Sequence, residues 1–220
     1  MPNLTLIIPA KNESESLPNV LNELKNFNFD KMVILEESDK STIESIKNFD
    51  CQILFQSKKG YGNALIDGIN NVKSEYLCIF NADGSFDPKY LDEMLKLCED
   101  KDMIFASRYL KGAGSDDDTV LTKIGNYIFS LLGKIFFSIR LSDILYTYVL
   151  GKTDSFKKLN LSSNDFCFCV EMPIKAKRLK MDIIDMPSFE RKRIAGEKKV
   201  NEFKDGFKIL LFMIKSFIKV

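Results

Sequence analysis

Strand-like and helix-like segments alternate along the first half of this chain, and this alternation constrains its fold more than any other feature. Short apolar runs bounded by turn formers predict strands at residues 4–8, 32–35, 52–55, 76–80 and 103–106. Apolar residues at helical spacing predict helices between them, at residues 14–27, 41–49, 62–72 and 88–98. Ser14 is the expected N-cap of the first helix. Such alternation predicts an α/β fold: a mostly parallel sheet flanked by helices, with ligands at the carboxyl ends of the strands.

The second half of the chain is less regular. The sequence predicts a long apolar helix over residues 121–139, a further helix over 165–180 and a strand over 181–186. The acidic segment 111–118 is interpreted as a solvated turn cluster, and residues 190–200 as a basic loop. We expect one large domain over residues 1–200, followed by an amphipathic helix over residues 201–220.

The terminal helix has a lysine stripe on one face. Lys204, Lys208, Lys215 and Lys219 fall within an arc of roughly 60° on a helical projection. The opposite surface is apolar, with Phe203, Phe207, Leu210, Met213, Ile214, Phe217 and Ile218. This pattern is typical of a helix that lies in a membrane interface, and equally of an amphipathic helix docked on a protein core. Both interpretations stay open at this point.

The composition excludes several kinds of chemistry. The chain has 220 residues and no histidine, so Ser–His and Cys–His nucleophile systems and His-ligated metals are excluded, and acid–base work falls to other side chains. A net charge of +1 gives no global polycation, so no nucleic acid partner is expected. Five cysteines without a CxxC pair fit a reducing compartment, and we find neither a signal peptide nor an uncharged apolar stretch long enough to span a membrane. We therefore expect a cytoplasmic protein.

Oxygen-bearing side chains follow the predicted strand 76–80 at alternate positions. Asn81, Asp83 and Ser85 would point the same way if the chain were extended there. Mg²⁺ or Mn²⁺ bound beside a diphosphate requires few protein ligands of this kind, because the phosphates supply the rest. The alternative is that Asn, Asp, Gly and Ser simply form the turn that ends a strand.

Further polar clusters follow other predicted strands. A carboxylate at the end of the second strand, such as Glu36, can accept hydrogen bonds from ribose hydroxyls or a base N–H. Gly60 and Gly62 allow close backbone approach at a helix N-terminus. Each cluster is weak evidence alone, and their order along one sheet edge makes them specific. They are Ile8–Glu13, Glu36–Glu37 and Lys58–Ile69.

In this order, the segments resemble the family 2 glycosyltransferases of the GT-A (Rossmann-like) fold, with dolichol- and polyprenyl-phosphate sugar transferases as the most similar branch. The resemblance covers residues 4–212. Its motifs are Pro9–Glu13 (PxxNE), Glu36–Glu37, Lys59–Ala64 (KGxGxA), Asn81–Asp83 (DxD), Asp87–Pro88, Ser107–Tyr109 (SRY), Asp143, Glu171 and Arg193–Lys199 (RxxGxSK).

The resemblance implies a role for each matching residue. Arg108, Arg193 and Lys199 would contact phosphates of the donor or acceptor, and Asp83 would hold a metal with Asn81 and Ser85. The remaining residues of the implied nucleotide-sugar site are Pro9, Lys11, Glu13, Ile34, Glu36 and Ala82. The chain departs from the family at Asn81, where the first Asp of DxD is usual, and this should lower metal affinity. It also departs at Lys11, Glu36 and Lys198.

The resemblance implies a single inverting displacement from a nucleotide-sugar donor linked to UDP or GDP, assisted by Mg²⁺ or Mn²⁺. A phosphate monoester acceptor is already ionised and needs no general base, which suits a chain without histidine. A hydroxyl acceptor needs a carboxylate, for which Asp143 is the first candidate and Glu171 the second. Either residue could instead have a local structural role.

The predicted function is therefore glycosyl transfer. The acceptor is polyprenyl phosphate at the cytoplasmic membrane face, where the enzyme would bind peripherally, or a hydroxyl of a surface polysaccharide or glycolipid. A third alternative, based on Asn81, is a nucleotide-sugar-binding protein that has lost catalysis.

Overall fold

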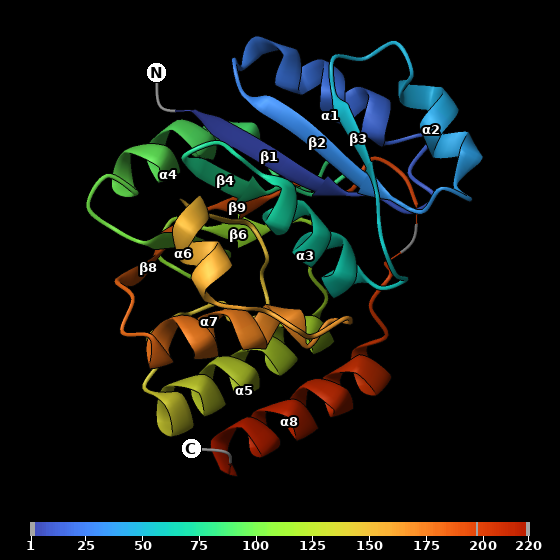
Figure 1. Cartoon of the computed structure of the whole chain (residues 1–220). Helices are drawn as coiled ribbons and strands as arrows, with labels where there is room; N and C mark the ends of the chain where they lie inside the picture. The colour runs from blue at the N-terminus through green and yellow to red at the C-terminus, as the bar shows by residue number, and fades with distance from the viewer. Residues whose placement is uncertain (1–2, 197, 219–220) are drawn as a thin grey trace.

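A seven-stranded sheet forms the centre of the molecule (Figure 1). The computed structural model describes residues 3–196 and 198–218. The strands follow the order β3-β2-β1-β4-β7-β5-β8, and all neighbours are parallel except β7, which runs antiparallel to both β4 and β5. Their bounds are β1 Leu4–Pro9, β2 Asp30–Leu35, β3 Gln52–Phe55, β4 Tyr76–Ile79, β5 Met103–Ser107, β7 Val149–Lys152 and β8 Ile183–Pro187. The predicted α/β fold, a mostly parallel sheet flanked by helices, is confirmed by this arrangement.

Helices cover both faces of the sheet (Figure 1). Their bounds are α1 Leu17–Glu23, α2 Lys40–Ile46, α3 Tyr61–Asn71, α4 Leu91–Leu97, α5 Val120–Phe137, α6 Thr153–Lys158, α7 Phe168–Arg178 and α8 Glu202–Ile218, with short 3₁₀ turns at Leu24–Asn26 and Pro88–Tyr90. Lys219 and Val220, the end of the predicted terminal helix, and Glu197 of the predicted RxxGxSK segment lie outside the described residues.

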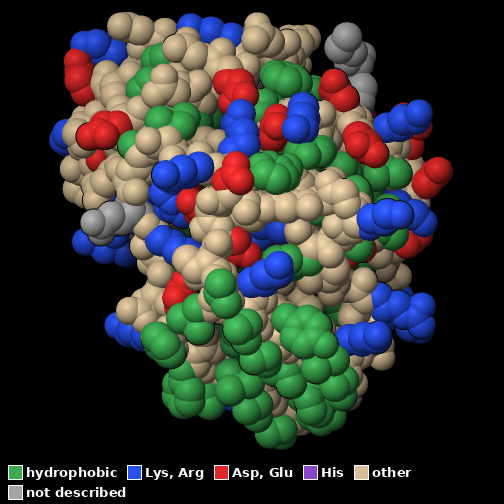
Figure 2. Space-filling view, turned by 180° about the vertical axis from the view of Figure 1, so that it is seen from behind, with side chains coloured by type: hydrophobic (Ala, Val, Ile, Leu, Met, Phe, Trp, Pro, Cys, Tyr) green, Lys and Arg blue, Asp and Glu red, His purple; other side chains and the backbone are tan. Residues whose placement is uncertain are grey.

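The terminal helix α8 docks on the long helix α5 and still exposes apolar side chains. Ile209 and Met213 are buried, and the Phe217 ring lies 5.0 Å from that of Phe136, measured between centroids. The two helices together carry most of the exposed large hydrophobic residues described, and Figure 2 shows them gathered at one end of the molecule. We call this surface the apolar face. It comprises Val120, Leu121, Ile124, Tyr127, Ile128, Leu131, Ile135, Phe136, Phe203, Phe207, Leu211, Ile214, Phe217 and Ile218.

Helix α5 is also long and apolar enough to cross a membrane by length and composition, contrary to the expectation that no segment would be. One side of it nevertheless packs on protein. Asn126 is buried and its Oδ1 accepts a hydrogen bond from Leu145 N, and Gly133 lies where a Cβ would be 2.7 Å from Ile144 Cδ1. In this fold α5 is therefore an amphipathic surface helix.

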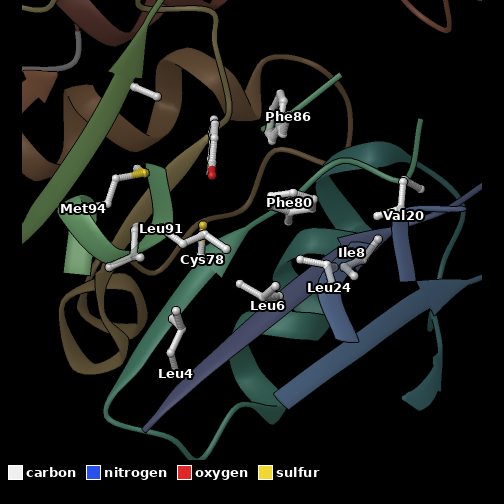
Figure 3. Close-up of a cluster of buried hydrophobic side chains, with 14 of the residues drawn as sticks. Leu4, Leu6, Ile8, Val20, Leu24, Cys78, Phe80, Phe86, Leu91 and Met94 are labelled. Carbon is white, nitrogen blue, oxygen red and sulfur yellow. The ribbon is translucent and has the colours of Figure 1, made fainter. Parts of the chain in front are cut away.

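The core divides into two clusters because successive side chains of a strand point to opposite faces. Along β1, Leu4, Leu6 and Ile8 join the cluster beneath α1, α2 and α4, whereas Ile7 joins the cluster beneath α3, α6 and α7. Figure 3 shows the first cluster, in which Phe80 and Phe86 extend the apolar packing beyond the end of β4. This packing fixes where the polar residues that follow each strand must lie.

Several predicted boundaries were wrong by a few residues. The first helix begins at Leu17 rather than near Ser14, because residues 14–16 form a turn in which Glu13 O accepts from Leu17 N. Pro88 opens a 3₁₀ turn capped by Asp87 rather than an α-helix. The strand β7 and the helix α6 that follows it were missed, because β7 runs antiparallel between β4 and β5 and so departs from the parallel strand–helix alternation on which the prediction depended.

A second, two-stranded sheet was also missed. Strands β6 (Gly114–Ser115) and β9 (Phe189–Glu190) pair in parallel. A Cβ on Gly114 would lie 2.9 Å from the Phe189 ring, so the glycine permits this approach. The pairing brings the acidic segment 111–118 against residues that follow β8.

Candidate active site

A cleft of about 410 Å³ lies at the carboxyl ends of β1, β2 and β4. Most of the residues predicted for the site line it, and three do not. Those that do are Pro9, Lys11, Glu13, Glu36, Asn81, Ala82, Asp83, Ser85, Arg108, Arg193 and Lys199. The structure therefore brings together side chains that are more than 180 positions apart in the sequence. Ile34, Asp143 and Glu171 are not among the lining residues.

One end of the cleft is formed by the residues that follow β1 and β2. The Glu36 carboxylate lies 3.4 Å from Lys11 Nζ and 3.6 Å from Lys59 Nζ. Ile34 is fully buried and its side chain packs against Gly68, so the prediction that it lines a nucleotide pocket was wrong for the side chain. The adjacent Tyr61, at the start of α3, stacks on Phe166 with ring centroids 5.0 Å apart.

Gly60 and Gly62 allow close approach, but to the protein's own backbone. A Cβ on Gly60 would lie 2.1 Å from Asn164 O, and one on Gly62 would lie 2.0 Å from Ser163 O. Gly60 also has φ +125°, which disfavours any other residue. These glycines let the loop before α7 pack against the start of α3, and so help to close the wall of the cleft.

The segment after β4 is a turn, not the extended chain that the prediction assumed. Asp83 Oδ1 accepts hydrogen bonds from Ser85 N at 3.0 Å and Ser85 Oγ at 2.7 Å, and Gly84 has φ +84°. The turn folds Ser85 back so that Asn81 Nδ2 lies 3.5 Å from Ser85 Oγ. The three side chains therefore converge, by turn geometry rather than by alternation.

Two cationic side chains, Arg193 and Lys199, line the cleft with Asp83, and Arg193 lies beside it. Backbone hydrogen bonds from Ile194 N to Asp83 O and from Arg191 N to Ser85 O, both 2.8 Å, hold residues 191–194 against the turn. This places Arg193 Nη1 3.9 Å from Asp83 Oδ2. Lys199 Nζ lies 3.5 Å from Glu13, whose carboxyl pKa is raised by burial.

The acidic segment 111–118 is not a solvated turn cluster, as the sequence was interpreted. Asp117 Oδ1 accepts a 3.1 Å hydrogen bond from Arg193 Nε, and Asp118 accepts one from Tyr109 OH. Both carboxylates line the cleft. The sequence pattern failed because Arg193, the partner of Asp117, lies 76 positions away and comes close through the segment that follows the β6–β9 pairing.

Arg108 does not present a free guanidinium to the cleft. Its Nε lies 2.7 Å from Asp143 Oδ2, its Nη2 3.0 Å from Asp143 Oδ1 and its Nη1 3.1 Å from Glu190 Oε2. Although burial lowers the pKa of Arg108, these carboxylates outweigh it and raise the pKa well above the ordinary value. The structure therefore disfavours the predicted phosphate contact of Arg108 in this conformation.

Neither predicted general base reaches the cleft. Asp143 is 1% exposed, and its two oxygens accept from the side chain and backbone N–H of Arg108. Glu171 is also 1% exposed, and its carboxylate binds Lys175 and the backbone of Ser162 and Ser163. The local structural role, given above as the alternative to catalysis, therefore fits both residues, because every oxygen of the two carboxylates is already bonded within the fold.

Sequence reasoning missed Glu190, Tyr61 and Tyr146, which line the cleft. Glu190 is 7% exposed, and burial raises its carboxyl pKa. Tyr146 stacks over Arg108, with the guanidinium carbon 4.5 Å from the ring centroid. No local motif marks these positions. Glu190, one of two carboxylates in the mainly basic segment 190–200, was the one visible signal.

The chain belongs to glycosyl transferase family 2, because the model of that family matches residues 5–160. It is therefore a glycosyltransferase. It is 27% identical over 209 residues to the undecaprenyl-phosphate mannosyltransferase of Micrococcus luteus, a match that covers 89% of this chain and 86% of the relative. It is 24% identical over 213 residues to the UDP-N-acetylglucosamine–dolichyl-phosphate N-acetylglucosaminyltransferase of Methanococcus voltae, covering 83% of each.

The solved structures agree on the fold. Glucosyl-3-phosphoglycerate synthase from Mycobacterium tuberculosis, in complex with Mn²⁺, UDP and glucosyl-3-phosphoglycerate, matches with a TM-score of 0.77. The match covers 100% of this chain and 81% of that one at 11% identity, so it shows a shared GT-A fold. The resemblance stated from the sequence motifs is confirmed.

Proposed function

We propose that this enzyme transfers a sugar from a UDP- or GDP-linked donor to a polyprenyl phosphate, by a single inverting displacement assisted by Mg²⁺ or Mn²⁺. The observation that carries the proposal is one cleft that joins Asp83, Arg193 and Lys199 and reaches the first turns of α5 and α8, where the apolar face begins. The names of both sequence relatives, which include a lipid phosphate, support it.

The donor would lie along the sheet edge. Pro9, Lys11 and Glu36 would contact the nucleoside, and the turn Asn81–Ser85 would face the diphosphate. Arg193 and Lys199 would then stabilise the negative charge that develops on the leaving nucleoside diphosphate. Asp117 and Glu13, which now pair with these cations, would share them with the ligand.

The residues around Asp83 fit a divalent cation that takes most of its ligands from the diphosphate. Among residues 3–196 and 198–218, no group of three or more Cys, Asp or Glu side chains could form a metal cage. Asp83 Oδ1 is bonded to Ser85, and Oδ2 accepts no hydrogen bond from a described residue. Asp83, with Asn81, would hold the ion, and Ser85 would orient the Asp83 carboxylate. When bound, the ion supplies positive charge beside the leaving diphosphate.

The acceptor would enter from the apolar face. Lys198 Nζ lies 2.9 Å from Thr122 Oγ1 on α5 and 3.4 Å from Glu202 Oε1 on α8, so a cation stands where the cleft meets both helices. A phosphate monoester there would be attracted by Lys198 and Lys199 and would need no general base. The loss of Asp143 and Glu171 as candidate bases is consistent with such an acceptor.

The apolar face would bind peripherally to the cytoplasmic face of a membrane, with residues 201–220 as an appended helix on a domain of residues 1–200. The two helices that carry the apolar face also carry exposed lysines, and Figure 2 shows Lys and Arg side chains at the edges of the apolar patch. They would attract anionic lipid headgroups while Phe and Ile side chains enter the headgroup region. The lysines are Lys123, Lys134, Lys204, Lys208 and Lys215.

Turnover with undecaprenyl phosphate tests the reaction. We expect transfer from one donor in a panel of UDP- and GDP-sugars, dependent on Mn²⁺ or Mg²⁺. Transfer only to glycan hydroxyls would replace the proposed acceptor. Donor binding without any turnover would indicate a binding protein.

Liposome flotation tests the membrane contact separately. We expect the wild type to float with anionic vesicles and Phe207→Glu to remain at the bottom. Phe55→Glu is the matched control, because Phe55 is an exposed aromatic on β3, outside the apolar face. Equal flotation of the two variants would contradict the proposed docking surface.

A further inference from the structure

The floor of the cleft around Arg108 contains more negative than positive groups. Three carboxylates face this one guanidinium: Asp143 at 2.7 Å, Glu190 at 3.1 Å and Asp118 at 3.6 Å. One cation against three anions leaves a formal excess of two negative charges. All four side chains are at most 9% exposed, so water screens this excess poorly.

Polar atoms of this floor have no partner within the described protein. Tyr146 OH and Asp118 Oδ1 are buried and make no hydrogen bond. Glu190 uses Oε2 to accept from Arg108 and from Ser115 Oγ at 2.6 Å, and no described residue bonds Oε1. All three residues line the cleft, whereas Asp143 does not. Buried polar groups are normally satisfied, so this arrangement points to a ligand that supplies the missing hydrogen bonds.

The strand order shows which part of a donor would reach this floor. Lys11 and Glu36 follow β1 and β2, and Asp83 follows the neighbouring β4. Arg108 follows β5, beyond β7, and Glu190 lies in β9 after β8. A nucleotide sugar with its nucleoside at β1–β2 and its diphosphate at Asp83 would therefore extend its sugar over the floor. This step rests on the proposed function.

We propose that Glu190, Asp118 and Tyr146 form the hexosyl subsite, and that its negative charge restricts the donor to sugars without an anionic substituent. Hydroxyls of a neutral hexose donate to the carboxylates and bond the Tyr146 hydroxyl. A uronosyl carboxylate in the same place brings a further anion next to Glu190 and Asp118 and offers them no donor. Like charges held this close discriminate strongly between ligands.

Binding of matched donor pairs tests this proposal. The pairs are UDP-glucose with UDP-glucuronate and GDP-mannose with GDP-mannuronate, and UDP and GDP alone serve as references. Calorimetry is performed with Mn²⁺ at about pH 8, because burial raises the Glu190 pKa and the carboxylate should be fully ionised. We expect the uronosyl donor of the preferred nucleotide to bind about 100-fold more weakly than its neutral partner.

Removing one negative charge from the subsite should reduce the difference in affinity between the neutral and the uronosyl donor. We expect Glu190→Gln to reduce the discrimination about tenfold, because one of the two carboxylates that face the ligand becomes neutral. Asp118→Asn should have an effect in the same direction, and it keeps the test usable if Glu190→Gln fails to fold. Asp116→Asn is the control, because Asp116 is exposed in the same loop, outside the cleft lining.

The outcomes separate the two proposals. Equal affinity for the neutral and uronosyl donors would overturn the charge restriction and leave the proposed function standing. Unchanged discrimination in folded Glu190→Gln and Asp118→Asn would assign the selectivity to other residues and overturn this subsite. Failure of UDP and GDP themselves to bind would overturn the proposed function, and this inference with it.

Discussion

The two halves of the cleft are built in different ways. In the half along β1, β2 and β4, the lining residues follow directly after parallel strands, as Lys11, Glu36 and Asp83 do. In the half along β7, β5 and β8, the contacts join residues far apart in the chain. Arg108 meets Asp143 across 35 positions and Glu190 across 82.

The two halves of the cleft also differ in their electrostatic environment. The first half places Lys11, Arg193 and Lys199 along one cleft, with Arg193 beside the Asp83 turn, where an anionic diphosphate can use them. The second half neutralises its one arginine and leaves an acidic floor. An arginine in a familiar motif therefore need not bind phosphate, because its role depends on which carboxylates the fold brings to it.

The largest expected effect is a loss of folding stability when the arginine at the floor of the cleft, in its second half, is replaced. We expect Arg108→Met to lower the free energy of unfolding by about 3–5 kcal/mol, because it leaves buried carboxylates facing one another without a cation. Denaturant unfolding at neutral pH measures the loss. A variant that is as stable as the wild type and has lost only affinity for phosphate would contradict this prediction. Arg108 would then bind the diphosphate, as the cations of the first half are proposed to do. Arg140→Met, at an exposed position, is the control.

The second largest expected effect is a loss of turnover when Asp83, in the first half of the cleft, is replaced. We expect Asp83→Ala to reduce Mn²⁺-dependent turnover about 10²–10³-fold, the usual consequence of removing one group that stabilises charge in the transition state. Melting temperature should change little, because, among the described residues, the Asp83 carboxylate accepts hydrogen bonds only from Ser85, and its backbone bond to Ile194 is retained in the variant. Donor turnover with saturating Mn²⁺ measures the loss. A variant that keeps most of its turnover would place the diphosphate elsewhere.

A substitution of Glu171 tests whether this residue has a structural or a catalytic role. Burial raises the pKa of its carboxyl, but hydrogen bonds from Lys175 and Ser163 outweigh burial, and the pKa is lowered. A carboxylate with a lowered folded-state pKa stabilises the fold above its ordinary pKa, and this contribution is lost as pH falls through the folded-state value. We therefore expect Glu171→Gln to cost about 1–3 kcal/mol at pH 7, where those bonds are to a charged acceptor.

Unfolding at several pH values checks this prediction. The difference in unfolding free energy between Glu171→Gln and the wild type should shrink below about pH 4.5, the ordinary pKa of a glutamate carboxyl. A difference that is constant with pH would show that the charge of Glu171 contributes nothing. Loss of turnover in a fully folded variant would instead restore the catalytic role predicted from the sequence.

Sequence reasoning reached the first half of the cleft because the determinants there are local. Alternating strands and helices fix the sheet edge, and residues such as Asp83 lie within a few positions of a predictable strand end. The second half depends on the antiparallel insertion of β7 and on the pairing of β6 with β9. Neither has a periodic signal, so Glu190 was missed. The resemblance made Asp143 a candidate base, and its position against Arg108 could not be read from the sequence.

The smallest expected effect concerns Asn81, the residue that departs from the family pattern in the first half. We expect Asn81→Asp to strengthen Mn²⁺ binding in the presence of nucleoside diphosphate about tenfold, because a second carboxylate beside Asp83 adds at least ~1 kcal/mol of attraction even at the dielectric constant of water. Manganese titration of the enzyme–nucleotide complex measures this change. Asn19→Asp, on the exposed side of α1, is the control for added charge. Weaker binding in Asn81→Asp would mean that the amide oxygen is not a ligand, and that the first half of the cleft holds its metal through Asp83 and the diphosphate alone.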